Sequence, residues 1–101
     1  MKQVLVRYKT KPEQAQENAQ LIAQVFAELK AKSPEGVRYL CLKLDDGTFV
    51  HFAAVEATGS PNPITSLDAF QAFQRGIEQR CIELPRAGDA IIVGNYRMVA
   101  G

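Results

Sequence analysis

Apolar and polar residues alternate near the start of the chain with the period of a half-buried β-strand. Val4, Val6 and Tyr8 share one parity of the segment 4–9, and Arg7 and Lys9 stand on the other. Because successive side chains of a strand point to opposite faces, this segment is predicted to be a first strand.

A helical period follows. Pro12 and Glu13 are typical of a first helical turn, where proline is tolerated and an acidic side chain complements the helix dipole. Ser33-Pro34-Glu35-Gly36 is expected to end the helix. The apolar residues between these two signals form one stripe: Ala15, Ala19, Ile22, Phe26 and Leu29.

Two apolar runs, 37–44 and 48–55, flank Asp45-Asp46-Gly47 and predict a β-hairpin. The register decides the surroundings of His51. A two-residue turn places His51 opposite Leu42, whereas a type I turn followed by a glycine bulge places it opposite Cys41, on the surface of Tyr39. We favour the second register, because it gathers the purely apolar alternate residues on one face.

The second half of the chain repeats the helix-then-strand order. A segment rich in turn formers, 57–63, leads to a predicted helix over 65–81, and 84–89 reads as an exit loop. The apolar run 90–99 is predicted to be the last strand. The order β-α-β-β-α-β predicts an α+β, ferredoxin-like fold, with two helices on one face of a four-stranded antiparallel sheet.

Apolar residues occupy both faces of the predicted strands, so one face needs a cover. Val4 and Val6 alternate with Leu5, and Leu40 and Leu42 alternate with Tyr39 and Cys41. Each large apolar side chain left in water forgoes about 1.5–3 kcal/mol of burial. The simplest cover is a second copy of the chain, and we expect a homodimer with two sheets packed face to face.

Composition narrows the class of protein. One hundred and one residues, 47% apolar and 23% charged, indicate a single soluble domain over 1–101. A net charge of +1 provides no strong electrostatic attraction to nucleic acid or anionic lipid. The apolar segment that begins at Val4 is too short for a signal peptide or a membrane span. We expect a cytoplasmic protein without nucleic-acid or membrane partners. One histidine and two cysteines cannot supply a four-ligand zinc site, so no metal is expected.

The order of elements is accompanied by several local matches to a known family. They are Pro12-Glu13, Tyr39, Asp45-Asp46-Gly47-Thr48-Phe49 with His51, Asn62-Pro63 and Leu67-Asp68-Ala69-Phe70-Gln71-Ala72-Phe73. With these features the chain resembles the antibiotic-biosynthesis-monooxygenase-like family of the dimeric α+β barrel superfamily. The resemblance implies a barrel formed by two chains. That family includes cofactor-independent oxygenases of quinols and polycyclic phenols, haem-degrading enzymes, and members with no known reaction.

The haem-degrading members rely on a first-strand asparagine, a tryptophan and a histidine on a helix. Here the first strand has no asparagine, the chain has no tryptophan, and its one histidine, His51, lies on a predicted strand. The resemblance therefore implies no haem and no other cofactor, and a cofactor-independent monooxygenase acting on a quinol or phenolic aromatic compound. Such an enzyme needs an apolar cavity, a proton acceptor and hydrogen bonds to an aryloxide.

His51 is the candidate catalytic base, since an unperturbed imidazole titrates near neutral pH. The alternative is a strand histidine satisfied by a structural partner. Cys41 has no base close to it in the sequence, so a thiolate is not expected there. Candidate ligand-binding residues are Tyr39, Phe70, Phe73, Asn95, Tyr96 and Arg97. Three functions stay open: an oxygenase, a non-catalytic sensor or carrier of an apolar metabolite, and a structural dimer without a cavity.

Overall fold

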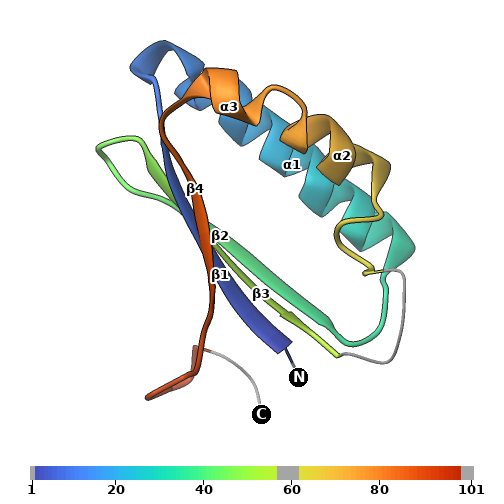
Figure 1. The fold of residues 1–101 in the computed structure, drawn as a ribbon. Coiled ribbons are helices and arrows are strands. Elements are labelled where there is room, and N and C mark those ends of the chain that lie inside the picture. Colours follow the sequence, from blue (N-terminus) through green and yellow to red (C-terminus); the bar gives the residue numbers. More distant parts are fainter. Residues whose placement is uncertain (1, 57–61, 99–101) are drawn as a thin grey trace.

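The computed structural model describes residues 2–56 and 62–98, and it places every helix on one face of a four-stranded sheet (Figure 1). The strands are β1 (Lys2–Thr10), β2 (Val37–Lys43), β3 (Thr48–Val55) and β4 (Cys81–Asp89). They lie in the order β2-β3-β1-β4, and each neighbouring pair is antiparallel. The fold is α+β and ferredoxin-like, as the order of elements predicts.

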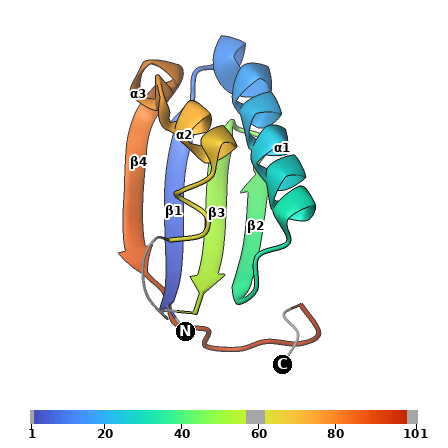
Figure 2. The same cartoon turned by 90° about the vertical axis from the view of Figure 1, so that its right-hand side faces the viewer.

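The helices cover the sheet in two rows, which Figure 2 shows in front of the strands. A 3-10 turn, η1 (Pro12–Gln14), leads into the long α1 (Ala15–Lys32), and the short α2 (Asp68–Gln74) and α3 (Ile77–Arg80) lie beside it. The helix α1 ends where Ser33 adopts a left-handed conformation with φ 46°. The core lies between helices and sheet and comprises Tyr8, Ile22, Val25, Phe49, Leu67, Phe73 and Cys81.

The hairpin has the predicted register with the glycine bulge. Cys41 pairs with His51 across β2 and β3. The loop closes through the backbone N–H of Leu44, which donates to the carbonyl of Thr48 at 2.8 Å, and Gly47 takes the positive φ of 88°. His51 therefore points to the helix face, while Leu42 lies on the other face with Val50.

The predicted helix over 65–81 is broken in two. Gly76 adopts a left-handed conformation with φ 74° between α2 and α3, a conformation that glycine reaches without steric cost. The Arg80 guanidinium donates to the carbonyls of Phe73 and Arg75 at the end of α2. Local chain geometry, together with this buried cation, thus overrides the helical spacing of the apolar residues.

The prediction of a last strand over 90–99 is wrong, because β4 is the segment Cys81–Asp89 that the sequence suggested to be partly a loop. Pro85 is tolerated there since β4 is an edge strand, where a missing N–H costs no ladder bond. Val4 pairs with Asp89 near the beginning of β1, so β1 offers almost no partner to later residues.

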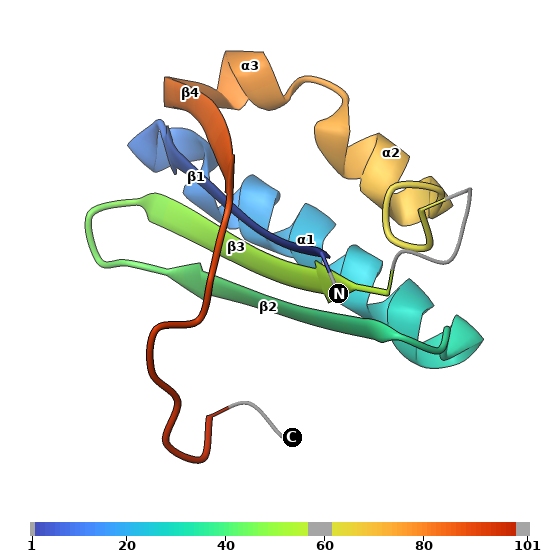
Figure 3. The same cartoon turned by 60° about the horizontal axis from the view of Figure 1, so that its bottom comes forward.

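Residues 90–98 leave the sheet, as Figures 1 and 3 show, and carry exposed apolar side chains. Ile91 is 87% exposed and Val93 99% exposed in the protomer. Residues 57–61 of the predicted linker and Val99 of the predicted strand lie outside the described residues. Among the residues that the structure describes, no helix is both long and apolar enough to cross a lipid bilayer.

The sheet face opposite the helices carries exposed leucine and isoleucine side chains. Leu42 is 52% exposed, although it lies in the middle of an apolar strand. The other large apolar residues exposed on the strands or the hairpin are Leu5, Leu40, Leu44, Ile82 and Leu84. No part of the helix layer covers this face in the protomer.

Candidate functional site

A cavity of about 320 Å³ lies between the helix face of the sheet and the α2 region. This volume is within the range of small-molecule pockets, about 300–1,000 Å³. It is also large enough to disfavour the hypothesis of a structural dimer whose interior is filled by its own side chains. The apolar lining comprises Val4, Val6, Ala53, Val55, Ile64, Phe70, Phe73, Ile77 and Pro85.

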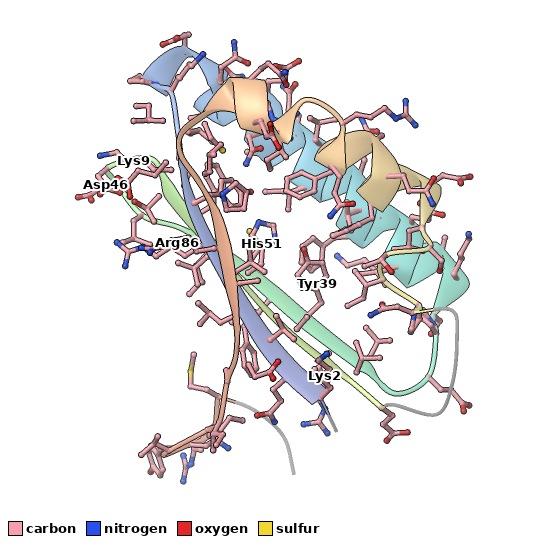
Figure 4. The ribbon with its side chains drawn as sticks, in the orientation of Figure 1. Lys2, Lys9, Tyr39, Asp46, His51 and Arg86 are labelled. Atoms are coloured by element: carbon pink, nitrogen blue, oxygen red, sulfur yellow. The ribbon has the colours of Figure 1, made fainter. Side chains whose placement is uncertain are left out.

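The polar side chains deepest in the wall of this cavity gather around His51, which is 5% exposed. The Tyr8 hydroxyl lies 2.8 Å from His51 Nε2, and the Tyr39 hydroxyl lies 2.6 Å from His51 Nδ1. Figure 4 shows His51 and Tyr39 projecting from the sheet into the space below the helices. Both ring nitrogens of the imidazole are thus held by phenol groups.

Burial sets the protonation states of these groups. It lowers the pKa of His51 to about 4, because a buried imidazolium loses its hydration. Burial also raises the pKa of Tyr8 and of Tyr39 above their ordinary value. At neutral pH the cluster therefore contains a neutral imidazole between two neutral phenols.

Cys41 has a base close to it, contrary to the expectation from the sequence. Its Sγ lies 3.5 Å from His51 Nε2, because the hairpin register places the two residues opposite each other. Burial raises the pKa of the Cys41 thiol to about 11, so the group stays a thiol at neutral pH. Both Cys41 and Cys81 are free cysteines.

A second layer of polar side chains supports Tyr8 from α1 and α3. Asn18 is fully buried, and its Nδ2 donates to the Tyr8 hydroxyl at 2.9 Å. The Arg80 Nε donates in turn to Asn18 Oδ1 at 3.0 Å. Arg80 is itself only 6% exposed, and its guanidinium lies 5.5 Å from the centre of the Phe73 ring.

The structure brings together four of the residues named from the sequence. His51, Tyr39, Phe70 and Phe73 all line the cavity. Asn95, Tyr96 and Arg97 do not line it; they lie in the segment 90–98, where Arg97 stacks over the Tyr96 ring at 5.0 Å. A ligand-binding role for these three stays a prediction without support from the protomer.

Sequence reasoning missed Tyr8, Asn18 and Arg80. Asn18 stands on the buried side of α1, between Ala15 and Ile22, so a polar residue within an otherwise apolar stripe was the available signal. No comparable pattern marks Arg80, because its burial depends on the break at Gly76.

Comparisons with solved structures give the same fold. A protein from Caulobacter crescentus CB15, provisionally named an antibiotic biosynthesis monooxygenase, matches with a TM-score of 0.73 and 18% identity, over 92% of this chain and 90% of its own. A second protein with that provisional name, from Bacteroides thetaiotaomicron VPI-5482, has a TM-score of 0.74 and 13% identity, over 91% and 89%.

A protein of unknown function from Nitrosomonas europaea matches with a TM-score of 0.70 and 20% identity, over 99% of this chain and 96% of its own. No protein-family profile matches the sequence, and no curated protein matches it either. The chain therefore has the fold of proteins named antibiotic biosynthesis monooxygenases, and this likeness concerns the fold alone.

Proposed function

We propose that this chain binds an aromatic small molecule in the cavity at His51 and oxidises it with O₂ as a cofactor-independent monooxygenase acting on a quinol or phenolic compound. The observation that carries the proposal is the cavity of about 320 Å³ with a buried imidazole held between Tyr8 and Tyr39 in its wall. The names of the structures with this fold point in the same direction.

The protein does not have to supply a redox cofactor, because the substrate is the source of electrons. The reaction converts a ring CH₂ group, or its enol form, to a carbonyl. One atom of O₂ becomes the carbonyl oxygen, and the other is released as water with the two hydrogens of the CH₂ group. The substrate supplies all the electrons that O₂ accepts. The protein has to bind the ring, exclude water and stabilise the aryloxide that reacts with O₂.

The cavity offers groups for each of these tasks. Phe70 and Phe73, with ring centres 5.7 Å apart, supply an aromatic wall for a flat ring. His51 serves the reaction through Tyr39, because tyrosine hydroxyls contact both of its nitrogens. The neutral imidazole has one N–H and one lone pair, so it can orient the Tyr39 hydroxyl toward the oxygen of an aryloxide.

The second candidate is a binding protein that holds an apolar metabolite without turnover. It is favoured by the preponderance of apolar side chains in the lining, which would retain a ligand by burial alone. Pocket and ligand class are the same in both candidates, and they differ only in whether O₂ is consumed.

We further propose that the chain functions as a homodimer. The exposed leucines of the open sheet face, among them Leu40 at 45% and Leu42 at 52%, support this arrangement. Apolar patches of this kind mark interaction surfaces when they are contiguous. A second sheet laid on this face would remove them from water.

The test of the enzyme is oxygen uptake with simple anthrols and quinols, corrected for autoxidation of each compound without protein. We expect uptake by the wild type and a large loss in His51→Ala, with one ring carbonyl formed for each O₂ consumed. Equal rates for the two proteins would remove His51 from the mechanism. A ligand retained in native mass spectrometry without O₂ uptake would favour the binding protein.

A further inference from the structure

The hydrogen bonds behind His51 form an unbroken chain that begins at a guanidinium. Arg80 Nε contacts Asn18 Oδ1 at 3.0 Å, and Asn18 Nδ2 contacts the Tyr8 hydroxyl at 2.9 Å. The Tyr8 hydroxyl contacts His51 Nε2 at 2.8 Å, and His51 Nδ1 contacts the Tyr39 hydroxyl at 2.6 Å. The first four of these residues are buried, and only Tyr39 at the end of the chain is partly exposed.

The direction of the first two links follows from the chemistry of arginine. A guanidinium has donors and no acceptor, so the atom of Asn18 that faces Arg80 must be the carbonyl oxygen. The amide NH₂ of Asn18 then faces Tyr8 and donates to the phenol oxygen. The Arg80 guanidinium cannot rotate freely, because it also donates to the carbonyls of Phe73 and Arg75.

The third link is fixed by the hydrogen of Tyr8. Tyr8 is 2% exposed, so its O–H needs an acceptor within the protein, and the lone pair of His51 Nε2 provides one at 2.8 Å. The opposite arrangement would direct both an Asn18 N–H and a His51 Nε2–H at the same phenol oxygen. The hydroxyl hydrogen of Tyr8 would then be buried without an acceptor, which is unfavourable.

The last link follows from the charge of the ring. The depressed pKa of His51 means that the imidazole is neutral and carries one hydrogen, which must sit on Nδ1 once Nε2 accepts. Nδ1–H then donates to the Tyr39 oxygen. The hydroxyl hydrogen of Tyr39 is left over for the cavity that this residue lines.

We propose that Asn18, oriented by Arg80, is a positioning residue that holds His51 as the Nδ1–H tautomer and makes Tyr39 a hydrogen-bond donor to the cavity. The site then selects ligands that present an acceptor oxygen, a ring ketone or an aryloxide. The proton positions stand on the geometry of the protein, whereas the ligand preference rests on the proposed function.

The tautomer can be measured without any ligand. The chain has one histidine, so the long-range proton–nitrogen correlation spectrum of ¹⁵N-labelled protein contains a single imidazole. At pH 7 we expect Nδ1 to have the chemical shift of a protonated ring nitrogen and Nε2 that of a nitrogen with a free lone pair. A wild-type spectrum of the Nε2–H tautomer, or of an imidazolium, would overturn the proposal.

One isosteric substitution, Asn18→Asp, should reverse the donor and acceptor roles in the hydrogen bonds from Asn18 to Tyr39. In Asn18→Asp the carboxylate accepts from Arg80 and from the Tyr8 O–H, so the phenol oxygen accepts from His51 Nε2–H. His51 Nδ1 then accepts from the Tyr39 O–H, and Tyr39 offers the cavity only lone pairs. The control is Gln24→Glu, which makes the same change of charge at an exposed position of α1 and should leave the tautomer unchanged.

Should Asn18→Asp fail to fold, Tyr8→Phe combined with Cys41→Ala gives the same information. This double variant removes the O–H that donates to His51 Nε2 and the thiol 3.5 Å from the same nitrogen, so the Nε2–H tautomer should increase at the expense of Nδ1–H. Retention of the Nδ1–H tautomer, unchanged, in folded Asn18→Asp or in the folded double variant would contradict the role assigned to these hydrogen bonds.

Three probes of one carbon skeleton test the ligand preference. They are 1-tetralone, which only accepts a hydrogen bond, 5,6,7,8-tetrahydro-1-naphthol, which donates and accepts, and tetralin, which does neither. In Asn18→Asp, and in Tyr39→Phe, we expect the affinity for 1-tetralone to fall about tenfold while that for tetralin is unchanged. The phenol should keep its affinity in Asn18→Asp, because it can donate to the Tyr39 oxygen.

The outcomes separate this proposal from the proposed function. The Nδ1–H tautomer without binding of any probe would support the proton positions and count against the function. The Nε2–H tautomer with tight binding of all three probes would overturn this proposal and leave the function standing. An equal loss for 1-tetralone and tetralin in Asn18→Asp would overturn the selection of acceptor oxygens.

Discussion

The carboxylate of Glu28, on α1, accepts a hydrogen bond at 2.8 Å from the backbone N–H of Ala69 in the first turn of α2. The second oxygen of the same carboxylate lies 2.8 Å from Lys32 Nζ. One side chain of α1 thus caps the helix that carries Phe70 and Phe73 over the cavity. This contact fixes the position of α2, and with it Phe70 and Phe73, relative to α1.

Removal of this cap should loosen α2 first. We expect Glu28→Ala to lower the melting temperature and the affinity for the tetralin probe, since Ala69 N–H loses its acceptor. Glu28→Gln keeps a side-chain oxygen and should lie between Glu28→Ala and the wild type. Gln24→Ala, at an exposed position of α1, is the control. Calorimetry that finds Glu28→Ala as stable as Gln24→Ala would contradict the capping role.

The depressed pKa of His51 makes stability depend on pH. The unfolded chain takes up a proton at the ordinary value of 6.5, and the folded chain does so only near 4. The contribution is therefore complete above 6.5 and is lost as the pH falls from 6.5 to about 4. The difference amounts to about 3 kcal/mol of unfolding free energy.

Urea unfolding at pH 7 and at pH 4.5 measures this loss. His51→Asn cannot titrate in this range, so it should lose clearly less stability than the wild type between the two pH values. Parallel pH profiles for the two proteins would show that other groups cause the acid sensitivity.

The cavity can be filled from the sheet side. Ala53 lines it from β3, and Ala53→Leu adds apolar volume where the structure has free space. We expect the affinity for tetralin to fall at least about tenfold, with little change in melting temperature. Ala27→Leu, at an exposed position of α1, should leave the affinity unchanged. A wild-type affinity in Ala53→Leu would place the ligand elsewhere.

The open sheet face should govern the oligomeric state. Leu42 is 52% exposed, so Leu42→Glu removes no contact within the helix-side core but would bury a charge in a sheet-to-sheet interface. Sedimentation equilibrium should find a dimer for the wild type and a folded monomer for Leu42→Glu. Ala27→Glu carries the same charge on α1 and should remain dimeric. A wild type that is monomeric at micromolar concentration would remove the homodimer from the proposal.

The hairpin illustrates how far sequence reasoning reaches. The alternation of apolar residues and the Asp45-Asp46-Gly47 loop were enough to predict that His51 faces Cys41. This works because one residue of slip would transfer every side chain of β3 to the other face. The ferredoxin-like order of elements followed from the same local signals.

The last strand could not be located in this way. Its Pro85 and Gly88 read as loop signals, and whether a proline is tolerated depends on the position of the strand in the sheet. The apolar residues after Asp89 looked like a better strand, but β1 has almost no partners left for them. Asn95, Tyr96 and Arg97 were named on that assumption, and they lie outside the lining of the cavity.

The cluster around His51 was predicted only in part for a similar reason. Tyr39 shares a sheet face with His51, so the register identifies it. Asn18 contacts Tyr8 from α1, and Arg80 contacts Asn18 from α3, which is far away in the sequence, so only tertiary packing places the three together. The local periodicity of apolar residues does not predict these contacts between side chains.

Arg80 stands directly before the edge strand β4, and its carbonyl accepts the backbone N–H of Lys11 at 2.8 Å. The guanidinium is therefore mechanically coupled to the margin of the sheet as well as to the interior. The same guanidinium donates to Asn18, which donates to the Tyr8 hydroxyl in the wall of the cavity. The margin of the sheet and the polar side chains around His51 thus share one anchoring residue, Arg80.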